Sequence, residues 1–378
     1  MAKIVDVEVL KIVSPGHDVG EDSLADVFVS RPTDIFYPKW KLGKFVSITA
    51  GATVVKITDE TGNYGYGFSG LYRSCATIVE EFFKPMLIGR EANEIEKLWD
   101  AMYRSSVAYG RMGIVMLAIS AVDIALWDLF GKTTGLPVYQ LLGGKVRDVI
   151  KCYATGSDLE RYRDLGYKAN KIPIPYGPHQ GKWGMKENMK RVENVKKIMG
   201  DDAEIMFDCW MAWDPEYCAK MVKMVKGYNV RWIEEPVIAD DYEGYRRCRD
   251  ICNEHGILLT GGEHEYTRWG VKKFLDMQCV DILQCDVGYT GGITEMRKII
   301  AYAKAKNVMV IPHAHCMPTF HLSISSLMSP FAETLLIGDE RGRLFLGEPP
   351  VINGTITLSD KPGFGYELNP NYGRRLEF

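Results

Sequence analysis

Three acidic residues follow short apolar segments in the second half of the chain, at points where strands would end. Asp208 closes "EIMFD", Glu234 closes "VRWIE" and Glu263 follows "ILLTGG". Carboxylates that converge without a cation repel one another, which forces some of them to stay protonated. Mg²⁺ resolves this conflict because it binds carboxylates together with water and substrate oxygens. Any one of these acids could be an ordinary exposed residue, but the set predicts a Mg²⁺ site.

A candidate acid–base pair follows the next two segments. Asp286 ends "DILQCD", His313 follows "VMVIP", and Glu333 stands further along in "FAET". A carboxylate that fixes the tautomer of an imidazole also raises its basicity, which suits a general base near neutral pH. A histidine buried for structural reasons is the alternative. We favour the base, because His313 lies where its strand would reach the catalytic rim of a barrel.

Other ionisable residues near these positions have plainer explanations. Glu235 follows Glu234, and strand alternation would turn it to the opposite face, in a salt bridge behind the metal ligands. Structural or solvated positions explain four histidines at least as well as catalysis does: His179, His255, His315 and His321.

Eight short apolar segments would position the candidate site, and most are followed by a charged helical stretch. The segments are "VIKCYAT", "ANKIPI", "EIMFD", "VRWIEEP", "ILLTGGE", "DILQCD", "VMVIPH" and "FAETLLI". Such alternation predicts a parallel (β/α) barrel rather than an open sheet, and a barrel brings the carboxyl ends of its strands to one rim. The eighth segment could instead continue a helix.

The first 142 residues have a different pattern. "IVDVEVLKIV" and "ATVVKITDETGNYGYGFSG" alternate as antiparallel strands do, and the stretch from Ser74 to Phe130 is helical in period, with its last helix ending near Gly131. We therefore predict an α+β capping domain over residues 1–142 and a TIM-type barrel over 143–343. Residues 344–378 would form a C-terminal segment that returns toward the capping domain.

Composition limits the class of protein further. A net charge of −3 and a pI near 6.2 give no basic surface for nucleic acid or an anionic membrane, so we expect a small-molecule substrate. The nine cysteines form no Cys-x-x-Cys pair, which favours reduced thiols packed as small apolar residues. We expect no segment to reach the ~20 apolar residues of a membrane helix, and "MAKIVDVEVLKIVSPG" alternates as a strand does, unlike a signal peptide. The expected location is the cytoplasm.

With these motifs assembled, the chain resembles the enolase superfamily and, within it, the mandelate racemase subgroup. The resemblance rests on "MFDCW", "WIEEP", "GGEH", "CDVGYTGGIT", "IPHAH" and "FAET", and also on "AVDIALWDLFGKTTGLPVYQLLGGKVRD" and "EPPVINGTITLSDKPGFGYELN". It implies an α+β capping domain on a modified (β/α) barrel, Mg²⁺ as cofactor and a homo-oligomer. Enolase-superfamily sites with a Lys or His base and Mg²⁺ are a known general pattern.

The second barrel segment departs from the subgroup. Its members usually carry Lys-x-Lys there, with the second lysine as a base that faces the histidine across the substrate, whereas this chain has Lys171 and then Pro173. A two-base racemase is therefore disfavoured, and a one-sided mechanism is implied.

The sequence "KIPIPYGPHQGKWGMKEN", together with His264 after the third ligand, is similar to L-rhamnonate dehydratases. This resemblance implies Mg²⁺-dependent dehydration of a sugar acid to its 2-keto-3-deoxy derivative through an enediolate. His313, oriented by Asp286, would remove the C2 proton and then protonate the departing 3-hydroxyl. Glu333 would donate a hydrogen bond to the substrate carboxylate, and for that it would have to be protonated.

Substrate choice is less determined by the sequence. In this family the amino-terminal domain lends a loop to the barrel mouth, and the matching stretch here is "SLADVFVSRPTDIFYPKWKLGK", which lacks the histidine of rhamnonate dehydratases. Dehydratases for arabinonate, fuconate or galactonate, an acid-sugar epimerase and a non-catalytic binding relative stay open as alternatives. The candidate substrate contacts are Lys171, His264, Arg31, Lys39, Trp40 and Lys44.

Overall fold

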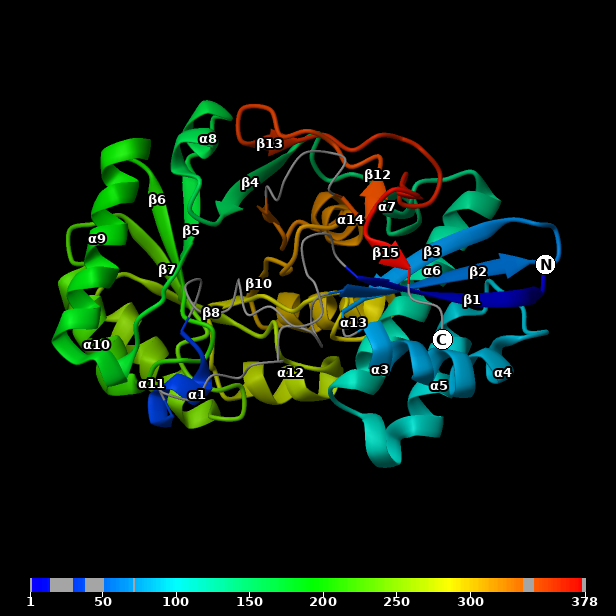
Figure 1. Cartoon of the computed structure of the whole chain (residues 1–378), viewed down its shortest axis with the longest axis horizontal. Coiled ribbons are helices and arrows are strands. Elements are labelled where there is room, and N and C mark those ends of the chain that lie inside the picture. Colours follow the sequence, from blue (N-terminus) through cyan, green and yellow to red (C-terminus); the bar gives the residue numbers. More distant parts are fainter. Residues whose placement is uncertain (1, 14–29, 38–50, 71, 336–342, 376–378) are drawn as a thin grey trace.

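The computed structural model describes residues 2–13, 30–37, 51–70, 72–335 and 343–375. Figure 1 shows an antiparallel sheet with its helices at one end of the molecule and a ring of parallel strands surrounded by helices at the other. Helix α1 (Pro32–Phe36) lies apart from the amino-terminal sheet and beside the barrel, where it contacts the short helix η2 (Pro178–Gln180).

The amino-terminal sheet has the strand order β15-β1-β2-β3, in which β15 (Arg374–Arg375) comes from the other end of the chain. The predicted strands form as β1 (Ile4–Val13), β2 (Gly51–Asp59) and β3 (Tyr64–Ser69), all antiparallel. Asp59 stabilises the turn between β2 and β3, because its Oδ1 accepts hydrogen bonds from the backbone N–H groups of Thr61 and Asn63. Helices follow the sheet in chain order: α3 (Tyr72–Thr77), η1 (Ile78–Phe83), α4 (Lys84–Leu87), α5 (Ile95–Gly110), α6 (Ile114–Thr134) and α7 (Val138–Leu141).

Helix α6 packs against β2 and β3 and corrects two expectations. It ends at Thr134, with Gly135 as a left-handed cap at φ 70°, and not near Gly131. Gly131 serves close packing instead, because a Cβ there would lie 2.6 Å from the Cα of Gly363. The helix is also long and apolar enough to cross a membrane by composition, with mean hydropathy 1.9, but 89% of that stretch is buried within the fold, as in a core helix.

The barrel contains the eight predicted parallel strands, including the eighth. They are β4 (Ile150–Thr155), β5 (Ala169–Pro173), β6 (Glu204–Asp208), β7 (Val230–Glu234), β8 (Leu258–Gly261), β9 (Ile282–Leu283), β10 (Met309–Val310) and β11 (Phe331–Thr334). Strand β11 pairs with β4, so the ring runs from β10 round to β11. The fold is thus the expected modified barrel with an α+β capping domain.

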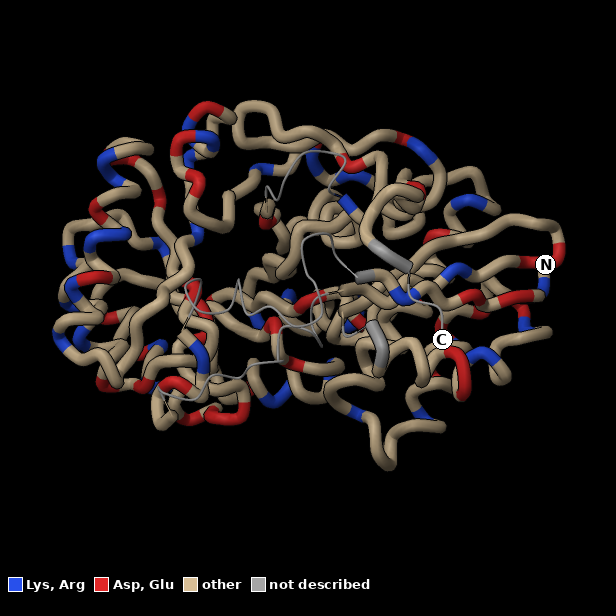
Figure 2. The backbone as a smooth tube through the Cα atoms, in the orientation of Figure 1, with Lys and Arg blue, Asp and Glu red and all other residues tan. Residues whose placement is uncertain are grey.

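A helix follows each of the first seven barrel strands. These helices are α8 (Leu159–Asp164), α9 (Gly181–Met199), α10 (Pro215–Met224), α11 (Tyr242–Asn253), α12 (Thr267–Asp276), α13 (Gly292–Ala305) and α14 (Met317–Ser325). Figure 2 shows basic and acidic residues interspersed along the backbone of the outer barrel helices. The interior carries a separate apolar cluster, formed by Tyr153, Ala169, Met206, Trp232, Ile282 and Ile311. Met206 and Trp232 stand two residues before Asp208 and Glu234, so this cluster forms the floor under the strand ends.

The chain after β11 crosses back over both parts of the molecule through β12 (Phe345–Leu346), β13 (Thr355–Ile356), β14 (Glu367–Leu368) and β15 (Arg374–Arg375). Strand β13 adds to β4 of the barrel, and β15 pairs with β1 of the amino-terminal sheet. Asp128 of α6 accepts from the backbone N–H groups of both Tyr66 and Phe364, each at 2.9 Å. The carboxyl-terminal segment therefore joins the barrel to the capping sheet, while the boundaries at 142 and 343 stay a prediction.

The cysteines are packed as predicted. All nine are buried with free thiols. Cys248 and Cys252 lie on one face of α11, and the Sγ of Cys252 is 3.9 Å from that of Cys218 on α10.

Candidate metal centre and acid–base site

The predicted site residues lie at the carboxyl edge of the barrel strands. Asp208 and Glu234 are the last residues of β6 and β7 and stand opposite each other in the strand register. Glu263, Asp286 and His313 lie two or three residues beyond their short strands, and Asp286 and His313 still pair with each other there. Glu333 lies within β11.

Burial dominates the electrostatics of the three proposed metal ligands. It raises the pKa of Asp208 and of Glu263 above the usual range, and it raises the pKa of Glu234 to about 8. The neighbouring carboxylates act in the same direction on each group. Three buried acids that disfavour their own ionisation supply an oxygen-only donor set, which fits a hard divalent cation.

Glu234 has two cationic or polar partners inside the barrel. Lys171 Nζ donates to Glu234 Oε1 at 2.9 Å, and Gln284 Nε2 donates to Glu234 Oε2 at 3.1 Å. Asp208 accepts the backbone N–H of Trp210 at 3.2 Å, and Trp210 has a left-handed φ of 41°. Both carboxylate oxygens of Glu234 are therefore bonded to side chains inside the barrel.

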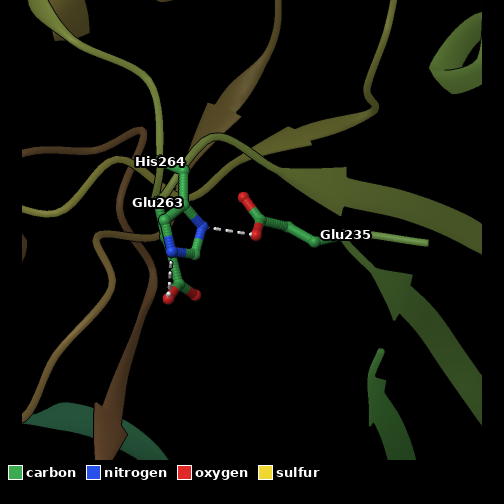
Figure 3. Close-up of side chains that lie close together, drawn as sticks. All are labelled: Glu235, Glu263 and His264. Carbon is green, nitrogen blue, oxygen red and sulfur yellow. Dashed lines mark hydrogen bonds and ion pairs between the residues drawn. The ribbon is translucent and has the colours of Figure 1, made fainter. Parts of the chain in front are cut away.

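One group of possible ligand atoms among the described residues is Glu235, Glu263 and His264, whose ligand atoms lie within 4.8 Å of one another (Figure 3). His264 Nδ1 lies 2.7 Å from Glu235 Oε2, and its Nε2 lies 3.7 Å from Glu263 Oε1. The backbone N–H of Gly262 also donates to Glu235 at 3.3 Å. Glu235 therefore forms the salt bridge that was predicted behind the ligands.

The backbone conformation of Glu235, and not strand alternation, directs its side chain to this position. Strand β7 ends at Glu234, and Glu235 takes a left-handed φ of 42°, which re-aims its side chain toward His264. Burial would lower the pKa of His264, but Glu235 and Glu263 raise it to about 10. His264 is consequently held as an imidazolium beside a candidate metal ligand.

Asp286 and His313 form the predicted pair. His313 Nδ1 lies 2.8 Å from Asp286 Oδ2, and the two residues form a parallel bridge beyond β9 and β10. His313 Nε2 lies 3.5 Å from Glu263 Oε2 and 3.7 Å from Glu333 Oε2. Burial would lower the pKa of His313, but Glu263, Glu333 and Asp286 raise it well above its ordinary value. With Nδ1 turned to Asp286, Nε2 is the atom available for proton transfer.

Glu333 differs from the expectation that it is protonated. Its Oε1 accepts from Lys171 Nζ at 2.9 Å and from Thr155 Oγ1, and its Oε2 accepts from the backbone N–H of Ala314 at 3.1 Å. Burial would raise the pKa of Glu333, but Lys171 and His313 lower it to about 2. Glu333 is a carboxylate that accepts hydrogen bonds and cannot donate one. Ala314 presents its N–H from a left-handed φ of 80°, a strained position of the kind found at functional sites.

The candidate substrate contacts are only partly described. The backbone N–H of Ser30 donates to Ile174 O at 3.1 Å, so the segment with Arg31 lies against the chain that leaves β5. Arg31 is half-buried, and its Nε lies 3.6 Å from Asp34. The remaining loop candidates, Lys39, Trp40 and Lys44, lie outside the described residues.

The other histidines lie apart from the acid–base pair. His315 Nε2 lies 3.3 Å from Glu348, and its Nδ1 accepts the N–H of Leu335. His321 is buried on α14, where its Nδ1 accepts the N–H of Tyr139. His179 lies in η2 and His255 just beyond α11.

Sequence reasoning missed two residues in the barrel interior. Thr155 and Gln284 bond Glu333 and Glu234 respectively, and both are buried. Thr155 ends β4, and Gln284 directly follows β9, so a search of every strand end for polar residues, and not only for ionisable ones, would have found them.

Two family models match this chain. The model described as "Enolase C-terminal domain-like" matches residues 154–372, and "Mandelate racemase / muconate lactonizing enzyme, N-terminal domain" matches residues 33–143. The chain therefore belongs to the enolase family, in its mandelate racemase and muconate lactonizing enzyme branch.

Individual relatives are similar to this chain over nearly its whole length. A protein named L-rhamnonate dehydratase from Saccharopolyspora erythraea is 38% identical over 388 residues, which cover 100% of this chain and 99% of that protein. The crystal structure of rhamnonate dehydratase from Gibberella zeae complexed with Mg is 31% identical with a TM-score of 0.88, covering 98% of this chain and 95% of that one. The 3,6-anhydro-D-galactonate cycloisomerase from Zobellia galactanivorans is 30% identical with a TM-score of 0.81, covering 97% of each chain. The resemblance inferred from the motifs is confirmed.

Proposed function

We propose that this chain is a Mg²⁺-dependent hydro-lyase that dehydrates a rhamnonate-like sugar acid to its 2-keto-3-deoxy derivative. One observation carries the proposal: among the residues that the structure describes, the site has one positioned base. His313 is bonded to Asp286, whereas β5, which carries the second base in racemases of this subgroup, ends in Pro173. Relatives named as rhamnonate dehydratases support the substrate class.

The proposed metal ligands are Asp208, Glu234 and Glu263. We prefer this set to Glu235, Glu263 and His264, because its three members are carboxylates that follow three consecutive strands, whereas His264 is held as an imidazolium and has no lone pair for a metal. When bound there, Mg²⁺ would act as a Lewis acid on the substrate carboxylate and 2-hydroxyl oxygens.

His313 would carry both proton transfers. Because Asp286 holds Nδ1 as a donor, a neutral His313 would have its lone pair on Nε2 and could take the C2 proton of the substrate there. The same nitrogen would then give that proton to the departing 3-hydroxyl, so water leaves, and the resulting enol becomes the 2-keto product. One base on one face is sufficient for this sequence.

Lys171 and Glu333 would form a fixed charge pair beside His313. Lys171 Nζ bonds both Glu234 and Glu333 at 2.9 Å. Burial would lower the pKa of Lys171, but these two carboxylates raise it well above its ordinary value. A lysine held in this way cannot serve as the second base that an epimerase would need. We propose that Glu333 keeps the ammonium of Lys171 and the N–H of Ala314 in place.

Substrate selection would fall to His264 and to the amino-terminal loop. His264 is a charged donor beside Glu263, suited to a hydroxyl or carboxylate oxygen of the sugar acid. Arg31, Trp40 and Lys44 stay proposals for the distal end of the substrate. A cytoplasmic location and a homo-oligomeric state also stay proposals.

The decisive experiment is a panel of five- and six-carbon sugar acids with Mg²⁺, read by formation of the 2-keto-3-deoxy product. The panel includes 3,6-anhydro-D-galactonate, because one structural relative is a cycloisomerase for that compound. Turnover of rhamnonate or a stereochemical neighbour, abolished by His313→Asn and unaffected by His255→Asn, supports the proposal. Exchange of the C2 proton with solvent deuterium and no dehydration would indicate an epimerase instead, and turnover of the anhydro sugar acid alone would indicate a cycloisomerase.

A further inference from the structure

The turn that connects Asp286 to helix α13 is bonded by the capping domain. Ser69, the last residue of β3, is 2% exposed, and its Oγ donates to the carbonyl oxygen of Gly288 at 3.0 Å. Further along the turn, the N–H of Gly291 donates to Ser120 Oγ of α6 at 2.9 Å, and the Nε1 of Trp99 donates to Gly291 O at 2.7 Å. A segment of the barrel rim is thus fixed by three side chains from outside the barrel.

The same turn fixes the carboxylate of Asp286. The N–H of Gly288 donates to Asp286 Oδ1 at 2.6 Å, while Oδ2 is the oxygen that faces His313 Nδ1 at 2.8 Å. A Cβ on Gly288 would stand only 3.1 Å from Asp286 Oδ1, so the glycine permits this close approach. One oxygen of Asp286 is therefore held by the turn and the other by the imidazole.

Hydrogen bonds on both sides of Gly288 consequently connect the capping sheet to the proposed base. Ser69 holds the carbonyl of Gly288, the N–H of Gly288 holds Asp286, and Asp286 orients His313. Among the described residues, the Oγ of Ser69 supplies the hydrogen bond found at the Gly288 carbonyl. Loss of that hydroxyl would leave a buried carbonyl without its donor, and the turn would have to move to find another.

We propose that Ser69 is a positioning residue for the Asp286–His313 pair, so that the capping domain sets the orientation of the imidazole. Ser69 acts through Gly288 and Asp286 and does not contact the reacting atoms. Its expected effect on turnover rests on the proposed function, because only there does His313 act as the base. Its expected effect on the geometry of the pair does not.

The test compares Ser69→Ala with Ser106→Ala in the full-length protein with Mg²⁺. Ser106 is a matched control, since it is buried in the same domain and its Oγ bonds the carbonyls of Met102 and Tyr103 within its own helix. We expect Ser69→Ala to lower kcat about tenfold, the scale of losing an outer hydrogen-bond partner of a site residue, with KM changed less than twofold. Ser106→Ala should lower the Tm without lowering kcat.

A second measurement is independent of turnover. The His313 Nδ1 proton should give a downfield proton NMR resonance, assigned by its disappearance in His313→Asn, and Ser69→Ala should shift or broaden it while Ser106→Ala does not. If Ser69→Ala does not fold, Ser120→Ala removes the second capping-domain contact to the same turn and is expected to give the same two effects. An unchanged resonance together with a kcat equal to that of the control would overturn the proposal. If the wild type turns over no sugar acid, the proposed function fails, and the resonance still decides the role of Ser69.

Discussion

Replacing Lys171 with methionine tests whether this lysine is a fixed charge that stabilises the fold or a catalytic base. The ammonium has no exposed surface, and its Nζ lies 2.9 Å from both Glu234 Oε1 and Glu333 Oε1. Methionine keeps most of the length but leaves two buried carboxylates without their shared cation. Removing one partner of a buried ion pair costs about 3–5 kcal/mol of the free energy of unfolding. At about 2.1 cal/mol/K per residue, the 378 residues have an unfolding entropy of about 0.8 kcal/mol/K, so the Tm should fall by about 4–6 °C.

Mg²⁺ should restore part of this loss, because a cation bound at Glu234 compensates one of the two charges. The assay is thermal unfolding of Lys171→Met and the wild type, with and without Mg²⁺, and the Mg²⁺-induced rise in Tm should be larger in the variant. Lys97→Met is the control, since Lys97 pairs with Glu94 at the surface and its loss should change the Tm by less than about 2 °C. A Lys171→Met protein with the Tm of the wild type and no activity would refute the charge pair and restore Lys171 as a candidate base.

Three further outcomes follow from the same contacts. Asp286→Asn keeps the shape of the side chain but no longer fixes the His313 tautomer, so kcat should fall about 10³–10⁴-fold, as in other carboxylate–histidine pairs, while the Mg²⁺-induced rise in Tm is kept. Burial raises the pKa of Glu234 to about 8, so protons compete with the cation; calorimetry from pH 6 to 8 should show tighter Mg²⁺ binding at higher pH, with proton release on binding. Burial lowers the pKa of His321 to about 3, so the unfolded chain binds more protons below pH 6.5 and stability falls as the pH decreases; at pH 5 the loss is about 2 kcal/mol, and denaturant unfolding of His321→Gln should lack it.

The barrel could be predicted because its strands are buried on both faces. Such strands appear as continuous apolar segments, and the charged helices between them separate one segment from the next. The end of α6 could not be predicted in the same way. A glycine such as Gly131 is typical of a helix end, but here it allows close packing against Gly363, more than two hundred positions later in the chain. The signal that distinguishes a cap from a close contact lies in the tertiary structure.

In the candidate site, too, some features follow from the sequence and others depend on tertiary contacts. The positions of Asp208 and Glu234 follow from where the apolar segments end, since parallel strands in register bring their ends together. The ionisation of Glu333 does not follow from position. It depends on Lys171 and Thr155, which reach it from β5 and β4, and no spacing along the chain indicates that these donors meet one carboxylate. Sequence order predicts which residues gather, and the contacts decide which of them carry charge.

These contacts also imply why the site needs a divalent cation for more than substrate binding. His313 must be neutral to accept a proton, yet the carboxylates of Glu263 and Glu333 raise its pKa well above the ordinary value. Lys171 already compensates Glu333, whereas the cations that the described part of the chain places beside Glu263 are two imidazoles. Compensating the charge of Glu263 would therefore weaken the field that keeps His313 protonated. The residue that we propose as a metal ligand and the residue that we propose as the base are thus coupled across 3.5 Å, and the imidazole becomes a competent base only when that ligand is neutralised.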